Sequence, residues 1–138
     1  MYVLIAGGGK VGSNLARTLI RAGHEVTLIE QRDSRFEVLE AELEHQVHKG
    51  DATELFTLER AGIEDADAVV VTTDGDNSNI VIGQMAQKQF AVPSVVVRVL
   101  DPARAEFYSS RGLNVVCPTS SAISTLTDAV RAAEGAIR

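Results

Sequence analysis

Short apolar runs alternate along the whole chain with longer segments in which apolar residues recur every three or four positions. The short runs are rich in β-branched residues and predict strands at residues 2–6, 25–29, 46–49, 68–72, 94–99 and 113–117. Unbroken apolar runs such as residues 69–71 and 95–97 are typical of parallel strands that are covered on both faces.

The longer segments have the spacing of helices. Gly23 is placed to end the first helix. The apolar face of that helix is formed by Val11, Leu15, Ala16, Leu19 and Ile20. Further helices are expected to begin at capping residues or an early proline, near Asp33, Thr53, Asp76 and Asp101-Pro102.

Strands and helices alternate strictly, which predicts a single α/β domain over residues 1–138. Right-handed crossovers place the helices of such a chain on both faces of a parallel sheet. We therefore expect a Rossmann-like, doubly wound, six-stranded parallel sheet. No linker, internal repeat or low-complexity stretch interrupts the sequence.

A glycine-rich loop of the form G-x-G-x-x-G follows the first strand and opens the first helix. It consists of Gly7, Gly8, Gly9, Lys10, Val11 and Gly12. The first glycine of this pattern permits the tight turn, the second lets a phosphate approach the backbone, and the third lets helix and strand pack closely. The free N–H groups at the start of the helix attract an anion. The loop therefore predicts a phosphate-binding site, although glycines also serve plain turns.

Glu30 ends the second predicted strand, eighteen residues after Gly12. A carboxylate there can accept hydrogen bonds from a ribose diol and repels a 2′-phosphate. The alternative is that Glu30 is only a solvated strand end. Glu30 therefore favours NAD or another adenine nucleotide. NADP stays open as a ligand, because Arg32 could bind a 2′-phosphate.

Two further segments lie where strands of this topology end at the ligand crevice. The first, after the third strand, is Gly50-Asp51-Ala52-Thr53, and the second, after the fourth strand, is Thr72-Thr73-Asp74 with Asn79 one turn later. Each segment also fits a turn with a helix cap. Arg98, near the end of the fifth strand, needs a partner, which is either an anion or a core carboxylate.

Composition narrows the classes of function. Thirteen Lys and Arg against nineteen Asp and Glu give a net charge of −6, which argues against a general nucleic-acid binder and against electrostatic attachment to an anionic membrane. The single cysteine, Cys117, excludes an intrachain disulfide and a cysteine-based zinc site. No apolar run approaches the ~18 residues of a membrane span. We expect a cytoplasmic protein that can still dock on a membrane protein.

Few residues suit catalysis. Neither tyrosine forms a Tyr-x-x-x-Lys pair, and Cys117 has no nearby base in the sequence. His45 and His48 are expected to lie on one strand, facing opposite ways. We expect a non-enzyme with neither catalytic nor metal site. The alternatives are the cofactor-binding domain of an NAD-dependent oxidoreductase, and a structural module that binds no nucleotide.

Several motifs together resemble the RCK N-terminal domain, also called TrkA-N or KTN, of Trk and Ktr potassium uptake regulators. Besides the glycine loop and Glu30, they are Gly50-Asp51-Ala52-Thr53, the run from Ala61 to Val70, Thr73 with Asn79, and Arg98-x-x-Asp101-Pro102. The resemblance covers nearly the whole chain. It implies a cytoplasmic regulatory subunit, peripheral to the inner membrane, that binds NAD(H) or ATP/ADP. Such subunits form dimers within a ring whose change of shape gates a membrane-embedded potassium transporter or channel.

The resemblance also implies roles for individual residues. Gly7, Gly9, Lys10, Val11 and Gly12 would hold the phosphates, and Glu30 would bind the ribose. Asp51 and Ala52 would flank the adenine, Thr73 would line the pocket floor, and Arg98 would lie near the phosphates or a dimer interface. Their neighbours Gly8, Gln31, Thr53 and Thr72 are also expected to belong to the cofactor site. In the family the last helix crosses to a neighbouring subunit. The helix predicted here from about residue 119 to 134 carries a matching stripe, Ile123, Leu126, Ala129, Val130 and Ala133.

The sequence departs from the family at two points. Relatives often place glycine directly after the threonine of the fourth-strand turn, where this chain has Asp74. Family members usually continue into a second ligand-binding domain. Because this chain ends after its sixth helix, we expect an isolated domain or a short member of the family.

Overall fold

The computed structural model describes residues 1–137, in which six strands form one sheet with every neighbouring pair parallel. The strands are β1 (Tyr2–Ala6), β2 (Glu25–Glu30), β3 (Val47–Lys49), β4 (Ala68–Val71), β5 (Ser94–Arg98) and β6 (Asn114–Val116). They lie in the order β3-β2-β1-β4-β5-β6, so the order reverses between β1 and β4. The predicted Rossmann-like fold is confirmed, and each predicted strand is found with ends that differ by at most one residue.

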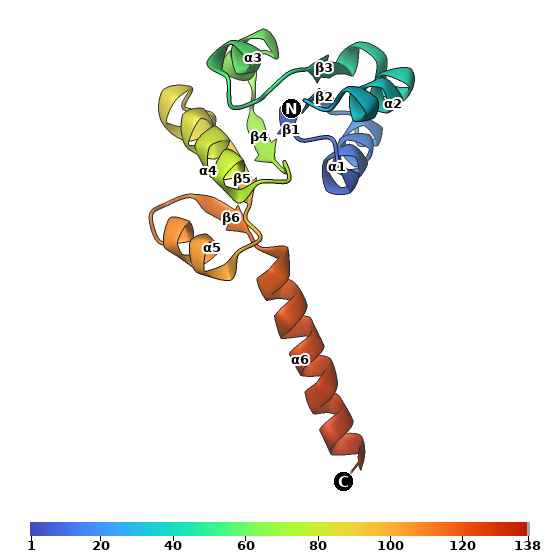
Figure 1. Cartoon of the computed structure of the whole chain (residues 1–138), viewed down its shortest axis with the longest axis vertical. Coiled ribbons are helices and arrows are strands. Elements are labelled where there is room, and N and C mark those ends of the chain that lie inside the picture. The colour runs from blue at the N-terminus through green and yellow to red at the C-terminus, as the bar shows by residue number, and fades with distance from the viewer. Residues whose placement is uncertain (138) are drawn as a thin grey trace.

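Six α-helices connect or follow the strands (Figure 1). They are α1 (Lys10–Arg21), α2 (Asp33–Leu43), α3 (Leu55–Arg60), α4 (Asp76–Gln84), α5 (Pro102–Ser109) and α6 (Pro118–Ile137). Short 3-10 turns at Glu44–Gln46 and Ile63–Asp65 and a π-helical turn at Met85–Gln89 complete the connections. Within residues 1–137, no helix has both the length and the hydropathy needed to cross a bilayer.

The sheet buries a separate apolar cluster on each face because successive side chains of a strand point to opposite sides. On β1, Val3 and Ile5 pack with residues of α1 and α2. Leu4 and Ala6 belong to the other cluster, which includes residues of α3, α4 and α5. Both faces of the central strands are therefore covered, as the unbroken apolar runs of the sequence indicate.

The first helix ends at Gly23, as predicted. This residue has a φ of +91°, which glycine adopts at little cost. Its N–H donates to the carbonyl of Ile20, and the N–H of His24 donates to the carbonyl of Leu19, both at 3.0 Å. These two bonds satisfy carbonyls that have no partner within the helix and turn the chain toward β2.

Only one of the expected aspartate caps has the predicted geometry. Asp101 caps α5 by accepting a hydrogen bond of 3.0 Å from the N–H of Arg104. Asp33 and Asp76 instead lie inside the first turns of α2 and α4, where their carboxylates bind other partners. The helix expected near Thr53 begins two residues later, at Leu55.

The two histidines expected on one strand do not share one. His45 lies in the 3-10 turn Glu44–Gln46, and only His48 lies on β3. Glu44 has a φ of +53°, so the chain turns sharply before the strand begins. Among residues 1–137, no group of three or more potential metal ligands comes together.

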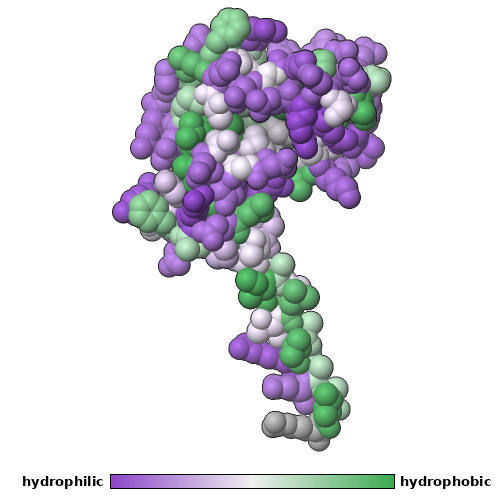
Figure 2. All heavy atoms as spheres, viewed as in Figure 1, coloured by the Kyte–Doolittle hydropathy of each residue, from purple (hydrophilic) through white to green (hydrophobic). Residues whose placement is uncertain are grey.

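Helix α6 extends away from the sheet, and none of its described residues is buried (Figure 1). Ile123, Leu126 and Val130 are 56%, 66% and 67% exposed. Their apolar side chains follow the length of the helix (Figure 2). The predicted stripe is therefore present, and within the described chain nothing covers it.

We expect Gly83→Ala to destabilise the fold by about 1–3 kcal/mol, because the added methyl group overpacks the core. A Cβ at Gly83 in α4 would lie 2.3 Å from Cγ2 of Val97 on β5. Gly135→Ala is the matched control, since a Cβ at that helical glycine meets no atom within 4 Å. Urea unfolding of the two variants measures the difference, and equal midpoints would contradict the packing described here.

Candidate functional site

A crevice of about 200 Å³ lies at the carboxyl ends of the strands, where the strand order reverses. Nine of the predicted site residues line it: Gly7, Gly9, Glu30, Gln31, Asp51, Ala52, Thr53, Thr72 and Thr73. They come from the last residue of β2 and from the loops after β1, β2, β3 and β4, so the sheet topology brings them together.

Five predicted site residues do not line the crevice: Gly8, Lys10, Val11, Gly12 and Arg98. Gly8 and Gly12 are buried behind the loop, whereas Lys10 and Val11 are exposed at the start of α1. Arg98 lies behind the β4 loop and contacts its backbone. These residues shape the loops or flank the crevice.

The crevice wall also contains residues outside the predicted site. The additional lining residues are Ile29, Arg32, Gly50, Asp74, Gly75, Ser78 and Ile82. Gly50 and Asp74 lie within the two segments described above. Their position next to predicted site residues could have identified them. Ser78 and Ile82 are contributed by α4, and only the packing of that helix against the sheet brings them here.

The glycine loop has little room for side chains, except at Gly9. Gly7 has a φ of +107°, and a Cβ there would lie 2.6 Å from the carbonyl of Thr72. A Cβ at Gly12 would lie 1.8 Å from the oxygen of Gly7, so α1 and the end of β1 are in close contact. A Cβ at Gly9 would meet only the guanidinium of Arg32, at 3.9 Å. The backbone at Gly9 is therefore open to the crevice.

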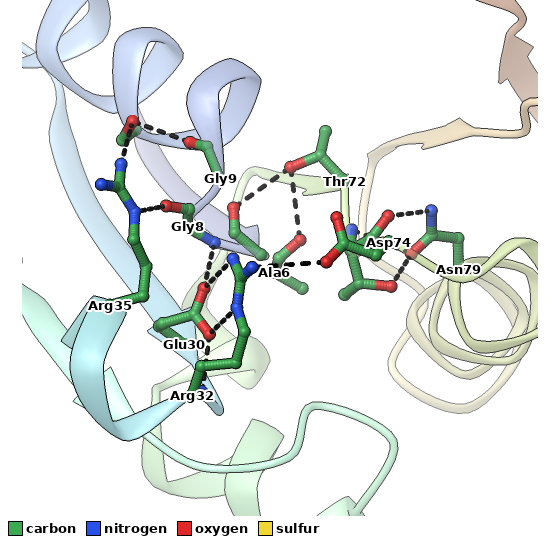
Figure 3. Close-up of polar contacts among 12 residues, drawn as sticks. Ala6, Gly8, Gly9, Glu30, Arg32, Arg35, Thr72, Asp74 and Asn79 are labelled. Atoms are coloured by element: carbon green, nitrogen blue, oxygen red, sulfur yellow. Dashed lines mark hydrogen bonds and ion pairs between the residues drawn. The ribbon is translucent and has the colours of Figure 1, made fainter.

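Two side chains from β2 and α2 hold the loop at Gly8 (Figure 3). The N–H of Gly8 donates to Oε1 of Glu30 at 3.0 Å, and its carbonyl accepts from Nε of Arg35 at 2.6 Å. Arg35 also donates to Oγ of Ser13 at 3.0 Å. Sequence reasoning missed Arg35, because nothing in a helical arginine indicates which backbone carbonyl it will reach.

Glu30 is buried, with 4% of its surface exposed, so the alternative interpretation of Glu30 as only a solvated strand end is wrong. Its Oε1 accepts from Gly8 and from Nη2 of Arg32, and its Oε2 accepts from the backbone N–H and Nε of Arg32. Burial by itself raises the pKa of Glu30, but the hydrogen bonds from Arg32 and Gly8 outweigh it and hold the pKa below its usual value. The carboxylate is therefore ionised and fixed at the crevice wall.

Arg32 connects two sides of the crevice. Besides its contacts with Glu30, its Nη1 lies 3.4 Å from Oδ2 of Asp74, in the loop after β4. The same residue also borders the open backbone of Gly9. The end of β2 and the β4 loop are thus joined by one guanidinium across the glycine loop (Figure 3).

Asn79 organises the β4 loop and is not a helix cap. Its buried side chain accepts from the N–H and the hydroxyl of Thr73 and donates to the carbonyls of Thr73 and Arg98. Arg98 donates to the carbonyls of Thr72 and Thr73 at 3.1 and 2.9 Å. Backbone carbonyls, rather than a core carboxylate, are therefore the partners that Arg98 has among the described residues.

Asp51 forms the turn that the simpler interpretation expected. Oδ1 of Asp51 accepts two hydrogen bonds from Thr53, one from the backbone N–H at 2.9 Å and one from the side-chain hydroxyl at 2.7 Å. Ala52 is buried between them and forms part of the crevice wall. The turn presents this short segment to the crevice whether or not a ligand binds.

We expect Glu30→Gln to lower the free energy of unfolding at neutral pH by about 1–3 kcal/mol, as hydrogen bonds to a charged group are lost. Because the folded-state pKa of Glu30 lies below 4.5, its ionised form stabilises the protein above that pH. This contribution is lost as the pH falls through the folded-state pKa. The difference between wild type and variant should therefore shrink in urea unfolding on acidification.

Glu42→Gln is the control for this measurement. Glu42 also pairs with an arginine, Arg17, at 2.5 Å, but its side chain is 45% exposed, against 4% for Glu30, so its loss should change stability little. Equal losses at neutral pH in the two variants would contradict a special role for the buried carboxylate.

Known proteins resemble this chain in sequence and in fold. The TrkA protein of the Trk potassium uptake system of Streptomyces coelicolor is 38% identical over 116 residues, which are 84% of this chain and 52% of that protein. The chain spans about half the length of the curated relatives it matches.

Solved structures with the same fold include the GsuK channel bound to NAD, with a TM-score of 0.80 and 27% identity over 98% of this chain and 24% of that one. GsuK bound to ADP matches with a TM-score of 0.77 and 27% identity over 92% of this chain and 33% of that one. Residues 3–119 match the TrkA-N domain. The match covers most of the chain and includes all the residues that line the crevice. The chain therefore belongs to the TrkA-N domain family.

Proposed function

We propose that this chain is a nucleotide-binding regulatory module of a potassium transport system, with NAD(H) or ATP/ADP as its ligand. The observation that carries the proposal is the buried, ionised carboxylate of Glu30 beside an open glycine backbone. The GsuK structures with NAD and ADP and the name of the TrkA relative support it.

The residues present suit an adenine nucleotide. Gly9 leaves the backbone accessible to a phosphate, next to the first N–H groups of α1. Glu30 is a hydrogen-bond acceptor for a ribose diol. Asp51, Ala52 and Thr53 form a wall for the base. In this proposal the nucleotide supplies no chemical step and acts by being bound or released.

The crevice favours binding over catalysis. Its carboxylates already have partners: Glu30 and Asp74 pair with Arg32, and Asp51 accepts from Thr53. Among the described lining residues there is no Cys, His, Lys or Tyr to act as nucleophile or base. A regulatory module that is not an enzyme is therefore the function we favour over the cofactor-binding domain of an oxidoreductase.

The exposed face of α6 suits a second copy of this chain. Its side chains Ile123, Leu126 and Val130 form one apolar stripe on a helix that extends away from the sheet and has no buried residue among those described. Packing of that stripe in a homodimer, and of dimers in a ring, would give nucleotide exchange a way to change the shape of an assembly. A membrane-embedded potassium transporter or channel is the partner that the family indicates.

Isothermal titration calorimetry with NADH, NAD, ATP, ADP and NADPH tests the ligand class. We expect binding of at least one non-2′-phosphorylated nucleotide, and a loss of about tenfold or more in affinity for Gly9→Val, whose side chain would stand in the crevice. Because a Cβ at Gly9 meets no atom nearer than 3.9 Å, this variant should unfold at the wild-type urea concentration.

Two outcomes of the titration would contradict the proposal. A folded wild-type chain that binds none of the five nucleotides removes the proposed ligand class. Wild-type affinity in Gly9→Val would show that ligands bind elsewhere and that the glycines serve only the turn.

Sedimentation velocity tests the role of α6. We expect the wild type to sediment as a dimer or larger species and Leu126→Asp to shift toward the monomer, because a buried charge without a partner opposes association. Ser121→Asp, on the opposite face of the same helix, is the control and should leave the distribution unchanged. A strictly monomeric wild type at high concentration would contradict this part of the proposal.

A further inference from the structure

The guanidinium of Arg32 lies where a bound nucleotide would need space. Its Nε and Nη2 are 3.2 and 3.1 Å from the carboxylate oxygens of Glu30, and its Nη1 is 3.4 Å from Asp74. Its Nη2 also borders Gly9, whose open backbone is the proposed approach for a phosphate. One side chain thus covers both the proposed ribose acceptor and the proposed phosphate position (Figure 3).

The carboxylate of Glu30 has two donors on each oxygen. Two of these four donors are backbone N–H groups, of Gly8 and Arg32, which the fold holds in place. The other two belong to the Arg32 side chain, which is 52% exposed and can rotate toward solvent. A ribose diol that binds Glu30 must therefore replace the side chain of Arg32.

Once a ribose has displaced it from Glu30, the Arg32 guanidinium has only a weaker partner left. Its remaining partner is the carboxylate of Asp74, which is 80% exposed and therefore well screened by water. A phosphate over Gly9 would offer the displaced guanidinium a new anion within the crevice, and arginine binds phosphate with two parallel hydrogen bonds. A nucleoside offers no such anion.

We propose that Arg32 is a specificity-determining residue that makes binding in this crevice depend on a phosphate group. It occupies the ribose acceptor Glu30 when the crevice is empty, and it transfers to the phosphate of a nucleotide when Glu30 receives the ribose. When a nucleoside binds, Arg32 loses its contact with Glu30 and gains no phosphate in its place. This inference rests on the proposed nucleotide-binding function and adds to it a reason for the rejection of unphosphorylated ligands.

The test compares adenosine with ADP in the wild type and in Arg32→Ala, followed by NMR titration of the amide signals of Gly8 and Gly9. In the variant we expect adenosine to bind about threefold to fivefold more tightly, and ADP to bind no more tightly than before. The ratio of the adenosine Kd to the ADP Kd should therefore fall by at least about threefold to fivefold. Arg32→Lys, which keeps the charge but not the paired donors, should give an intermediate ratio.

Arg21→Ala is the matched control. It removes an arginine charge at the C-terminal end of α1, away from the crevice, and should leave the ratio of the adenosine Kd to the ADP Kd unchanged. An unchanged ratio in Arg32→Ala, or weaker adenosine binding, would overturn the inference while leaving the proposed function intact. A wild-type chain that binds neither ADP nor adenosine would overturn the inference, and it would overturn the proposed function as well if NADH, NAD, ATP and NADPH also failed to bind.

Discussion

The arrangement of the crevice depends on one buried charge, the carboxylate of Glu30. Placing an ionised carboxylate at the end of a central strand is unfavourable unless hydrogen bonds replace its water. The glycine loop supplies one of them from the N–H of Gly8, and the start of α2 supplies the others from Arg32. The charge therefore fixes the loop, and the loop in turn keeps the charge at the crevice wall. Gly8 can serve this purpose because its carbonyl is held from the other side by Arg35.

The opposite side of the crevice has a second polar anchor, built on the amide of Asn79. That side chain satisfies the backbone of Thr73 and reaches the carbonyl of Arg98 on β5, while Arg98 reaches back to the β4 loop. β5 pairs with β6, and β6 leads into α6. The β4 loop of the proposed ligand site is therefore connected, through Arg98 on β5, to β6, the strand that leads into the proposed assembly helix.

Regular features of the sequence were sufficient for the fold. Strand positions follow from apolar runs, and the end of α1 follows from Gly23, since both depend on nearby residues. Helices begin at Asp33 and Asp76 as predicted, but these residues do not cap them, because their carboxylates bind Lys49 and the β5–α5 connection instead of their own helices. Asn79 similarly serves distant backbone groups where a local cap was expected.

By itself, the sequence determined the order of the strands along the chain, the glycine loop and the acidic residue at the end of β2, because each is a local pattern with a definite spacing. Only the tertiary structure decided that Arg32 spans Glu30 and Asp74, that Arg35 holds Gly8, and that Arg98 contacts the carbonyls of the β4 loop. Long arginine side chains can reach many acceptors. Which acceptors they reach depends on the loops that the sheet brings to the same edge, and no spacing along the chain contains that information.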